Sequence, residues 1–401
     1  MPRPNHTTTR SPDVPVHLRR DGLDPAPELA RLRAERPVTK VRLPRGAEVW
    51  LVTRYDDVRE VLGDAARFSS ADGVRAGLGR PTPRQGAFGV LIGYDPPDHT
   101  RLRRLLAPEF TVRRMERLRP RVEAIVAGHL DAMAAAGPPA DLVTSFALPV
   151  PSLVICELLG VPYADRAEFQ QRSARRLSVT LDAEAQVAAG LESQAYLREL
   201  VARQRSDPGD DLIGMLVREH GAGLADEELV GLADLLLLAG HETTANMLAL
   251  GTLLLLRDPE QRELVRRGQD VDRAVEELLR YLSVVHAVLP RTAREDVVLA
   301  GERIRAGDVL LCSLPAANRD PAVGGDPERF DVSRRPASGH VAFGHGVHHC
   351  LGAPLARLEL RVAFPALLRR FPGLRLAAPV EELAFKSLAV IYGVESLPVT
   401  W

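Results

Sequence analysis

The feature that most constrains this sequence is its most apolar stretch, which runs from Leu229 to Leu256. Asp234, His241, Glu242 and Asn246 interrupt it, so no uninterrupted apolar span approaches the ~20 residues that a bilayer requires. A helix that is apolar on nearly all sides must be buried. The stretch therefore predicts a buried helix of a soluble protein, with no membrane span.

The rest of the chain gives no sign of a division. No Gly/Ser-rich or charged linker interrupts its 401 residues, so we expect one mostly helical domain over residues 1–401. Residues 1–16 are rich in Pro, Thr and Arg and lack the apolar run of a signal peptide, which predicts a mobile leader. Three scattered cysteines fit a reducing compartment. We expect a cytoplasmic monomer.

Charge excludes two classes of partner at the level of the whole chain. With 52 basic and 53 acidic residues, the net charge is -1. Such a balance gives no global attraction to nucleic acid or to a membrane surface. Any basic patch must be local, and we expect neither nucleic acid nor a membrane as a partner.

Helical periodicity dominates, over residues 97–106, 112–135, 165–171, 183–205, 227–256, 271–282 and 351–370. Short β-type runs bounded by Gly, Pro and Asp lie at residues 49–53 and 297–309. The pattern predicts a mainly α fold with small peripheral β-sheets.

A glycine-spaced loop precedes the last helical pattern and carries a cysteine, in the order Phe343-Gly344-His345-Gly346-Val347-His348-His349-Cys350-Leu351-Gly352. Glycines allow unusual dihedrals and a close approach of backbone to a flat ligand. A helix N-terminus offers unpaired N–H groups and positive potential, which favour a thiolate. Pro354 supports a helix that begins near Cys350. Cys350 is therefore predicted to be a ligand, and Cys156 and Cys312 are predicted to be buried apolar side chains.

Zinc offers an alternative interpretation of the same region. His345, His348, His349 and Cys350 supply mixed nitrogen and sulfur donors, but adjacent residues rarely converge on one ion. The helical zinc motif would require a second histidine four residues after His241, and that position is Ala. Neither spacing favours zinc.

The loop from Phe343 to Gly352 resembles the haem-binding loop of the cytochrome P450 family, Phe-Gly-x-Gly-x-[Arg/His]-x-Cys-x-Gly. The resemblance extends from residues 95–101 to residues 392–394 and is greatest to soluble actinobacterial members. It implies the cytochrome P450 fold, a helical triangular prism with small peripheral β-sheets, and haem b with Cys350 as axial ligand of the iron. It also places Phe343, Gly344, Gly352 and Ala356 against the cofactor.

The buried helix contains Ala239-Gly240-His241-Glu242-Thr243-Thr244, which resembles the family's [Ala/Gly]-Gly-x-[Asp/Glu]-Thr motif. A carboxylate among leucines is costly unless it is paired, hydrated or functional. The resemblance implies that Thr243 hydrogen-bonds dioxygen, that Glu242 relays protons, and that Ala239 and Gly240 face the cofactor. The alternative is a kinked core helix with a satisfied polar pair.

Glu277 and Arg280 match the family's Glu-x-x-Arg pair, and their spacing puts them on one helical face. The resemblance implies a buried structural pair that is tied to residues 318–331 and supports the cofactor loop. His99 and Arg103 lie four residues apart on another predicted helix. The resemblance makes them ligands of the haem propionates, together with Arg291 and His348, and charge-assisted hydrogen bonds suit this role.

The resemblance implies a monooxygenase that inserts one oxygen atom from O2 into a C–H or C=C bond, with a thiolate that favours O–O cleavage. Small and aliphatic residues are expected to line the pocket, which predicts an apolar, medium-to-large substrate from secondary metabolism. These pocket residues are Leu235, Ala239, Val285, Val288, Leu289 and Ile391.

The chain has no flavin or ferredoxin domain, so a separate ferredoxin and ferredoxin reductase are expected to supply electrons. A basic face would dock the ferredoxin, or would simply be solvated. Its members are Arg101, Arg103, Arg104, Arg113, Arg114, Arg357 and Arg361. A haem-binding sensor or electron carrier without turnover is the rival function, and it would not need Glu242 and Thr243.

Overall fold

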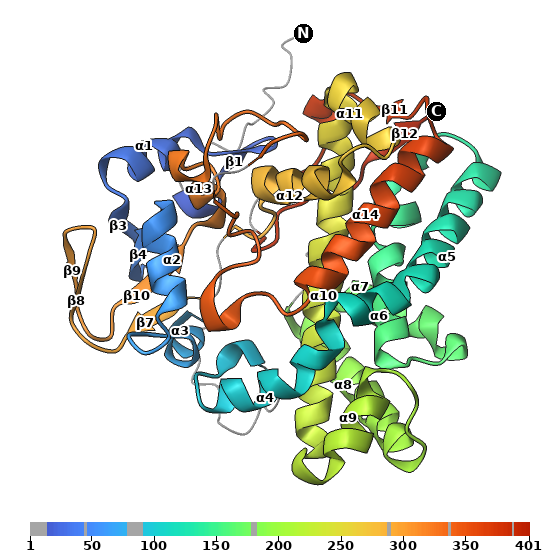
Figure 1. Ribbon diagram of the computed structural model, residues 1–401, viewed down its shortest axis with the longest axis horizontal. Helices are drawn as coiled ribbons and strands as arrows, with labels where there is room; N and C mark the ends of the chain where they lie inside the picture. The colour runs from blue at the N-terminus through green and yellow to red at the C-terminus, as the bar shows by residue number, and fades with distance from the viewer. Residues whose placement is uncertain are drawn as a thin grey trace.

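The computed structural model describes residues 14–43, 46–77, 91–177, 183–286, 290–335, 338–386 and 389–401. Long helices fill one side of the molecule, and the larger sheet lies on the other side with short helices around it (Figure 1). The fold is mainly α with small sheets, as predicted. Nearly all of the predicted leader lies outside the described residues.

The helices are α1 Pro27–Glu35, α2 Tyr55–Gly63, α3 Ser70–Gly77, α4 Asp98–Leu106, α5 Val112–Ala136, α6 Pro149–Leu159, α7 Arg166–Leu177, α8 Ala183–Ser206, α9 Leu212–His220, α10 Asp226–Arg257, α11 Pro259–Arg266, α12 Val271–Leu282, α13 Leu314–Ala317 and α14 Ala353–Arg370. Every predicted helical range overlaps one of these helices. α4 and α7 begin one residue later and α14 two residues later than predicted, and α7 continues to Leu177. Short helices such as α2, α6 and α11 were not predicted.

Helix α10 organises the helical side, where it packs against α6, α8 and α14. Three acidic residues in its first turn suit the positive end of the helix dipole, and the Glu228 carboxylate accepts a hydrogen bond from Ala225 N–H at 3.2 Å. Asp258 ends α10 and begins α11, where its side chain accepts from Gln261 N–H. The prediction of a buried helix is confirmed. No helix in the described part of the chain is both long and apolar enough to cross a membrane.

The strands are β1 Arg20–Asp21, β2 Asp24–Pro25, β3 Val38–Arg42, β4 Glu48–Val52, β5 Phe68–Ser69, β6 Ala140–Asp141, β7 Arg291–Ala293, β8 Val297–Leu299, β9 Glu302–Ile304, β10 Val309–Cys312, β11 Arg375–Leu376 and β12 Pro398–Thr400. The larger sheet has the order β3-β4-β10-β7-β5, and β10 pairs in parallel with β4. The predicted run at residues 49–53 thus lies in this sheet, as β4. The predicted run at residues 297–309 instead forms a separate hairpin of β8 and β9, and only its last residue, Val309, belongs to β10.

The chain between α13 and α14 crosses from the sheet side to the helical side (Figure 1). It carries the loop that ends at Cys350. Side chains of this crossing belong to both large hydrophobic clusters: Phe330 and Val332 to the one among the helices, and Val323 and Val341 to the one around the larger sheet. The loop is therefore held between two cores.

Candidate active site

Cys350 lies between a tight loop and the first turn of α14. Its backbone N–H donates to Phe343 O at 2.9 Å. Gly344 and Gly346 have φ values of 71° and 72°, a region that side chains rarely adopt. A Cβ on Gly346 would lie 2.4 Å from Leu62 O at the end of α2. Only glycine therefore allows the loop to pack this closely.

The Cys350 sulfur faces the N-terminus of α14. Burial raises the pKa of the Cys350 thiol, while backbone hydrogen bonds from Gly352 and Ala353 and the charges of Arg103 and Arg357 lower it. The side chain is nevertheless accessible at its surface. The sulfur lies deep in the protein and is still accessible, and N–H groups and two guanidinium groups face it. These surroundings suit a thiolate that binds a metal. Cys156 and Cys312 are buried, as predicted, and burial raises the pKa of each thiol to about 12.

The basic residues predicted to bind propionates form one group, which we call the cationic cluster: His99, Arg103, Arg291 and His348. The rings of His99 and His348 have centroids 4.1 Å apart. Burial lowers the pKa of His99, and the charges of Arg103 and Arg291 lower it further. Burial also lowers the pKa of His348, to about 3, with contributions from the same neighbours. The cluster thus joins residues from α4, β7 and the cysteine loop.

The cationic cluster contains polar atoms that have no protein partner. Neither ring nitrogen of His99 nor Nε2 of His348 has a hydrogen-bond partner among the described residues. The nearby Asp95 is already occupied, because it accepts from Ser69 at 2.6 Å and from Arg294 at 2.7 Å. Buried imidazole nitrogens without a hydrogen-bond partner are costly. The cluster therefore fits an anionic ligand, and two carboxylates on one ligand would satisfy the imidazoles.

The polar motif of α10 faces an accessible part of that helix. Ala239 is exposed, and Leu235, Glu242 and Thr243 are partly exposed, although most of α10 is buried. Thr243 Oγ1 donates to Ala239 O at 2.7 Å, the back-bonding expected of a mid-helix threonine. Gly240 instead lies against α6, where an added Cβ would meet Ile155 Cδ1 at 2.5 Å.

Glu242 is a partly buried carboxylate with one ion-pair partner. Its Oε1 lies 3.5 Å from Lys386 Nζ, and both side chains are largely covered. Burial raises the pKa of Glu242, while Lys386 and the Asn246 amide lower it. The sequence analysis did not assign Lys386, although its rarity is visible there, since Lys40 is the chain's only other lysine.

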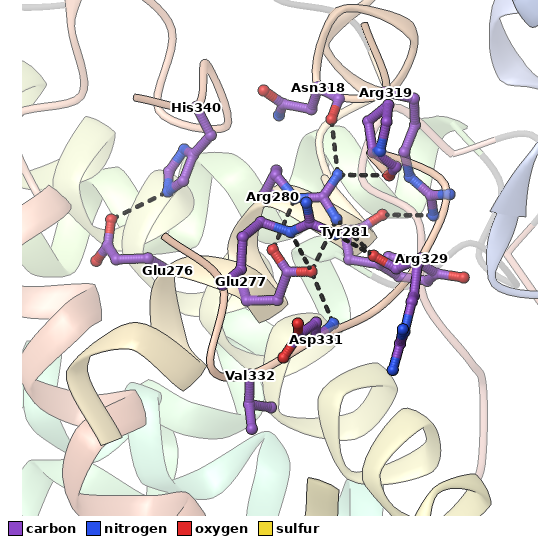
Figure 2. A network of polar contacts seen from close by, with 12 residues as sticks. Glu276, Glu277, Arg280, Tyr281, Asn318, Arg319, Arg329, Asp331, Val332 and His340 are labelled. Atoms are coloured by element: carbon purple, nitrogen blue, oxygen red, sulfur yellow. Dashed lines mark hydrogen bonds and ion pairs between the residues drawn. The ribbon is translucent and has the colours of Figure 1, made fainter. Parts of the chain in front are cut away.

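Glu277 and Arg280 form a buried network (Figure 2). Arg280 donates to both Glu277 oxygens, at 2.7 and 2.8 Å, and each side chain is 2% exposed. Arg280 also donates to Asn318 O at 2.9 Å, and Glu277 accepts from Asp331 N–H at 2.9 Å. Arg334 adds a further contact to Glu277 at 3.1 Å. The pair thereby joins α12 to the segment that precedes the cysteine loop.

A second network, not predicted from the sequence, lies beside the cysteine loop. Glu276 accepts from Arg357 at 2.6 Å, and His340 lies 3.1 Å from it (Figure 2 shows the His340 contact). The Arg357 guanidinium stacks over Phe343 at 4.7 Å. Ala356 N–H donates to Gly352 O within α14. Among the described residues, no three His, Cys, Asp or Glu side chains could hold a metal ion together, so the histidines near Cys350 form no zinc site.

Two of the predicted pocket residues meet directly, because Val285 forms a β-bridge with Ile391. Both are partly buried. Val288 and Leu289 lie outside the described residues. A separate groove of about 730 Å³ lies between α5 and α14 and contains none of the predicted cofactor or pocket residues, although Arg361 of the predicted basic face lines it.

The predicted basic face is largely neutralised. Arg101, Arg114, Arg357 and Arg361 pair with Glu228, Glu109, Glu276 and Asp272, respectively. Arg103 is half-buried and belongs to the cationic cluster, whereas Arg104 and Arg113 are exposed. The face is thus less basic than a count of its arginines implies.

Comparisons with known proteins place this site in a family. The model of the family described as "Cytochrome P450" matches residues 270–374. Cytochrome P450 165B3 of Amycolatopsis orientalis is 47% identical over 397 residues, which cover 96% of this chain and 98% of that protein. The chain belongs to the cytochrome P450 family. A second relative of this P450, the mycinamicin IV hydroxylase/epoxidase of Micromonospora griseorubida, is 46% identical over 95% of this chain and 96% of that protein.

Solved P450 structures share its fold. The structure of P450 StaH from glycopeptide antibiotic A47934 biosynthesis has a TM-score of 0.87 at 49% identity and covers 97% of this chain and 100% of that chain. OxyE from teicoplanin biosynthesis has a TM-score of 0.89 at 46% identity, over 97% and 100% of the two chains. The protein is therefore a P450 monooxygenase, with a haem-thiolate cofactor, O2, an organic substrate and redox partners.

Proposed function

We propose that this P450 binds haem b through the Cys350 thiolate and oxidises a medium-to-large apolar intermediate of secondary metabolism by hydroxylation or epoxidation. The observation that carries the cofactor assignment is the set of unpartnered ring nitrogens of His99 and His348, which lie near the Arg103 guanidinium group, itself close to Cys350. The two propionates of a porphyrin can accept hydrogen bonds from these groups. When bound, haem supplies the chemistry that activates dioxygen.

The chain's own residues then have separate tasks. Cys350 is held by the glycine loop and by the N–H groups at the start of α14. Arg103 and Arg291 would hold the propionates. Thr243 holds its hydroxyl on the accessible part of α10, where it can bind dioxygen or a water molecule. Glu242 can carry a proton, because burial raises its pKa while Lys386 keeps it ionisable.

The substrate proposal rests on the pocket and on the relatives. Leu235, Val285 and Ile391 are aliphatic and only partly buried, as residues that contact an apolar ligand would be. Among the relatives, one is a mycinamicin IV hydroxylase/epoxidase, and the solved structures StaH and OxyE come from the biosynthesis of glycopeptide antibiotic A47934 and of teicoplanin. We infer that a macrolide, polyketide or peptide intermediate enters this site.

The remaining assignments complete the proposal. A separate ferredoxin, reduced by a ferredoxin reductase, would deliver electrons to a cytoplasmic monomer. Arg104 and Arg113 are exposed and are available to an acidic partner, although ion pairs occupy much of the surrounding face.

Two measurements test this function. Macrolides, polyketides and peptides are added to the ferric protein, and a shift of the Soret band from low to high spin is expected for compounds that enter the pocket. Compounds that shift the band are then incubated with NADPH and surrogate ferredoxin and reductase. Oxygenated product is expected from the wild type. Reduction without product for every such compound would contradict the proposal and favour an electron carrier.

A variant sharpens the same test. Thr243→Ala is expected to keep the thiolate spectrum and the Soret response. The amount of product formed per oxygen consumed should fall about 10-fold or more. Thr252→Ala is the matched control, because Thr252 makes the same back-bond, to Leu248 O at 2.8 Å, in a buried turn of α10. Equal effects of the two substitutions would contradict the role of Thr243.

A further inference from the structure

The ion pair between Glu242 and Lys386 is the least expected feature of the site. The chain has only two lysines, Lys40 and Lys386, and every other basic residue among its 52 is an arginine. One of these two lysines lies 3.5 Å from the carboxylate that interrupts α10, with 15% and 16% of the two side chains exposed. Because the chain otherwise uses arginine, a lysine at this position indicates a role that arginine would not fill.

Backbone contacts fix the position of Lys386. Its N–H donates to Gly393 O at 2.9 Å, and Phe385 and Val394 form a β-bridge beside it. Gly393 in turn touches α10 so closely that an added Cβ would lie 1.9 Å from Asn246 Oδ1. Asn246 is one helical turn beyond Glu242. We call the segments 385–386 and 389–394 the C-terminal hairpin. The glycine therefore allows this hairpin to lie on α10 at the level where Lys386 reaches Glu242.

The same hairpin carries part of the predicted pocket wall. Ile391 forms a β-bridge with Val285, and Tyr392 N–H donates to Val284 O at 2.7 Å. Residues 389–394 thus join the segment after α12 to α10. A substrate that presses on Ile391 would press on the same hairpin that holds Lys386.

Lysine and arginine would act differently on Glu242. Elsewhere in this protein arginine binds carboxylates through two nitrogens, as Arg280 does with Glu277 and Arg357 does with Glu276. Such a fork fixes a carboxylate in one orientation. A single ammonium on a flexible stem attracts the carboxylate and leaves it free to rotate. His241, the adjacent titratable residue, is directed elsewhere, because its Nε2 lies 3.2 Å from Leu148 O.

We propose that Lys386 is a positioning residue for Glu242, which holds the carboxylate ionised and mobile and links proton delivery to the C-terminal hairpin. The inference rests on the proposed role of Glu242 as a proton relay. Lys386 acts through Glu242 and has no contact with the reacting atoms. Without the ammonium, burial alone would favour the protonated carboxyl group, which gives up and regains a proton at a higher pH.

The first test needs no turnover. Protein labelled with ¹³C at the lysine ε-carbons and held in the diamagnetic ferrous–CO form should give two lysine signals, one from each lysine. At neutral pH we expect the chemical shift of the Lys386 signal to change in Glu242→Gln, because the carboxylate beside the ammonium is removed. The Lys40 signal should not change. An unchanged Lys386 chemical shift would overturn the proposal.

The second test measures proton delivery. Hydrogen peroxide released per NADPH oxidised is followed from about pH 6 to pH 9 with surrogate ferredoxin and reductase and without added substrate. In Lys386→Gln, the pH midpoint of this ratio should move upward by about 1 unit. Lys386→Arg should keep the midpoint but increase peroxide release, because the fork restrains Glu242. Lys40→Gln is the control and should match the wild type.

The outcomes separate this proposal from the function on which it rests. If Glu242→Gln alters peroxide release and Lys386→Gln does not, Lys386 is no positioning residue and the relay role of Glu242 stands. If Glu242→Gln itself has no effect, the relay role fails, and the inference fails with it. For the inference to hold, Glu242→Gln must alter peroxide release and Lys386→Gln must move the midpoint upward.

Discussion

Glu277 on α12 and Glu242 on α10 are both carboxylates paired with a basic residue, yet their surroundings differ sharply. Glu277 is 2% exposed and accepts hydrogen bonds from two arginines and a backbone N–H. Glu242 is 16% exposed and has a single ammonium at 3.5 Å. The first environment fixes a carboxylate in one place. The second leaves it able to move and to change its protonation state.

The largest expected effect comes from weakening the fixed pair. Arg280→Lys keeps the charge but loses the fork to Glu277 and the bonds to backbone carbonyls, so the free energy of unfolding should fall by about 3–5 kcal/mol. Chemical denaturation of the haem-loaded protein measures this loss. Arg119→Lys is the control, since Arg119 and Glu116 have the same spacing at the surface, and a change below about 0.5 kcal/mol is expected there. Equal losses would remove the distinction between the two environments.

The cationic cluster is an intermediate case, because its two histidine rings have buried nitrogens that are unpartnered among the described residues. Arg103→Ala should weaken haem retention about 10- to 100-fold, the effect of one charged hydrogen bond. Transfer of haem to apomyoglobin measures the change. Arg104→Ala alters the next, exposed residue of α4 and should retain haem like the wild type. Normal retention in Arg103→Ala would argue against propionates at the cluster.

A smaller, pH-dependent effect on the free energy of unfolding is expected from Glu276. Burial raises its pKa, but hydrogen bonds from Arg357 and His340 outweigh burial and lower the pKa to about 2. A lowered carboxyl pKa stabilises the fold above the ordinary value of about 4.5 and ceases to do so as pH falls toward 2. The wild type should therefore lose more stability than Glu276→Gln over that range, as measured by acid denaturation.

Glu263 provides the matched control for this pH effect. Arg266 and Arg267 lower its pKa to about 2 at the exposed surface. Salt should screen that surface contribution, so Glu263→Gln should match the wild type at high ionic strength. If Glu276→Gln also matches the wild type under those conditions, the network beside the cysteine loop is not protected from solvent.

The smallest effect is expected for the ion pair between Glu242 and Lys386. Lys386→Arg should change the free energy of unfolding by less than about 1 kcal/mol, because the pair is partly accessible and singly bonded. The same denaturation experiment measures it. A loss comparable to that of Arg280→Lys would show that the Glu242 pair is structural, like the Glu277 pair.

The local parts of the fold and site were predictable because their signals are local. Periodicity predicted the buried helix α10 and the full length of α12, and the glycines around Cys350 predicted the turn before α14. The β-type runs predicted strands but not their order. Parallel pairing of β10 with β4 depends on contacts between residues ~260 positions apart, and no local pattern encodes such pairing.

The partners of the site residues were not predictable in the same way. Lys386 and Glu242 are far apart in sequence, and only the close packing of Gly393 on α10 brings them together. Glu276 was not predicted to be a site residue, because its neighbour Glu277 is the residue that matches the family pattern. The contact of Glu276 with Arg357 requires α12 and α14 to be adjacent. The basic face was overestimated because sequence counts charges and cannot show which of them are paired.

One comparison of spectra tests the role of Cys350 directly. The ferrous–CO difference spectrum of the wild type should have the thiolate form, and so should those of Cys156→Ser and Cys312→Ser, whose side chains are buried away from the loop. Cys350→Ser should lose the thiolate form while it can still bind haem through the cationic cluster. A thiolate spectrum that persists in Cys350→Ser would contradict this account and assign the ligand to another cysteine.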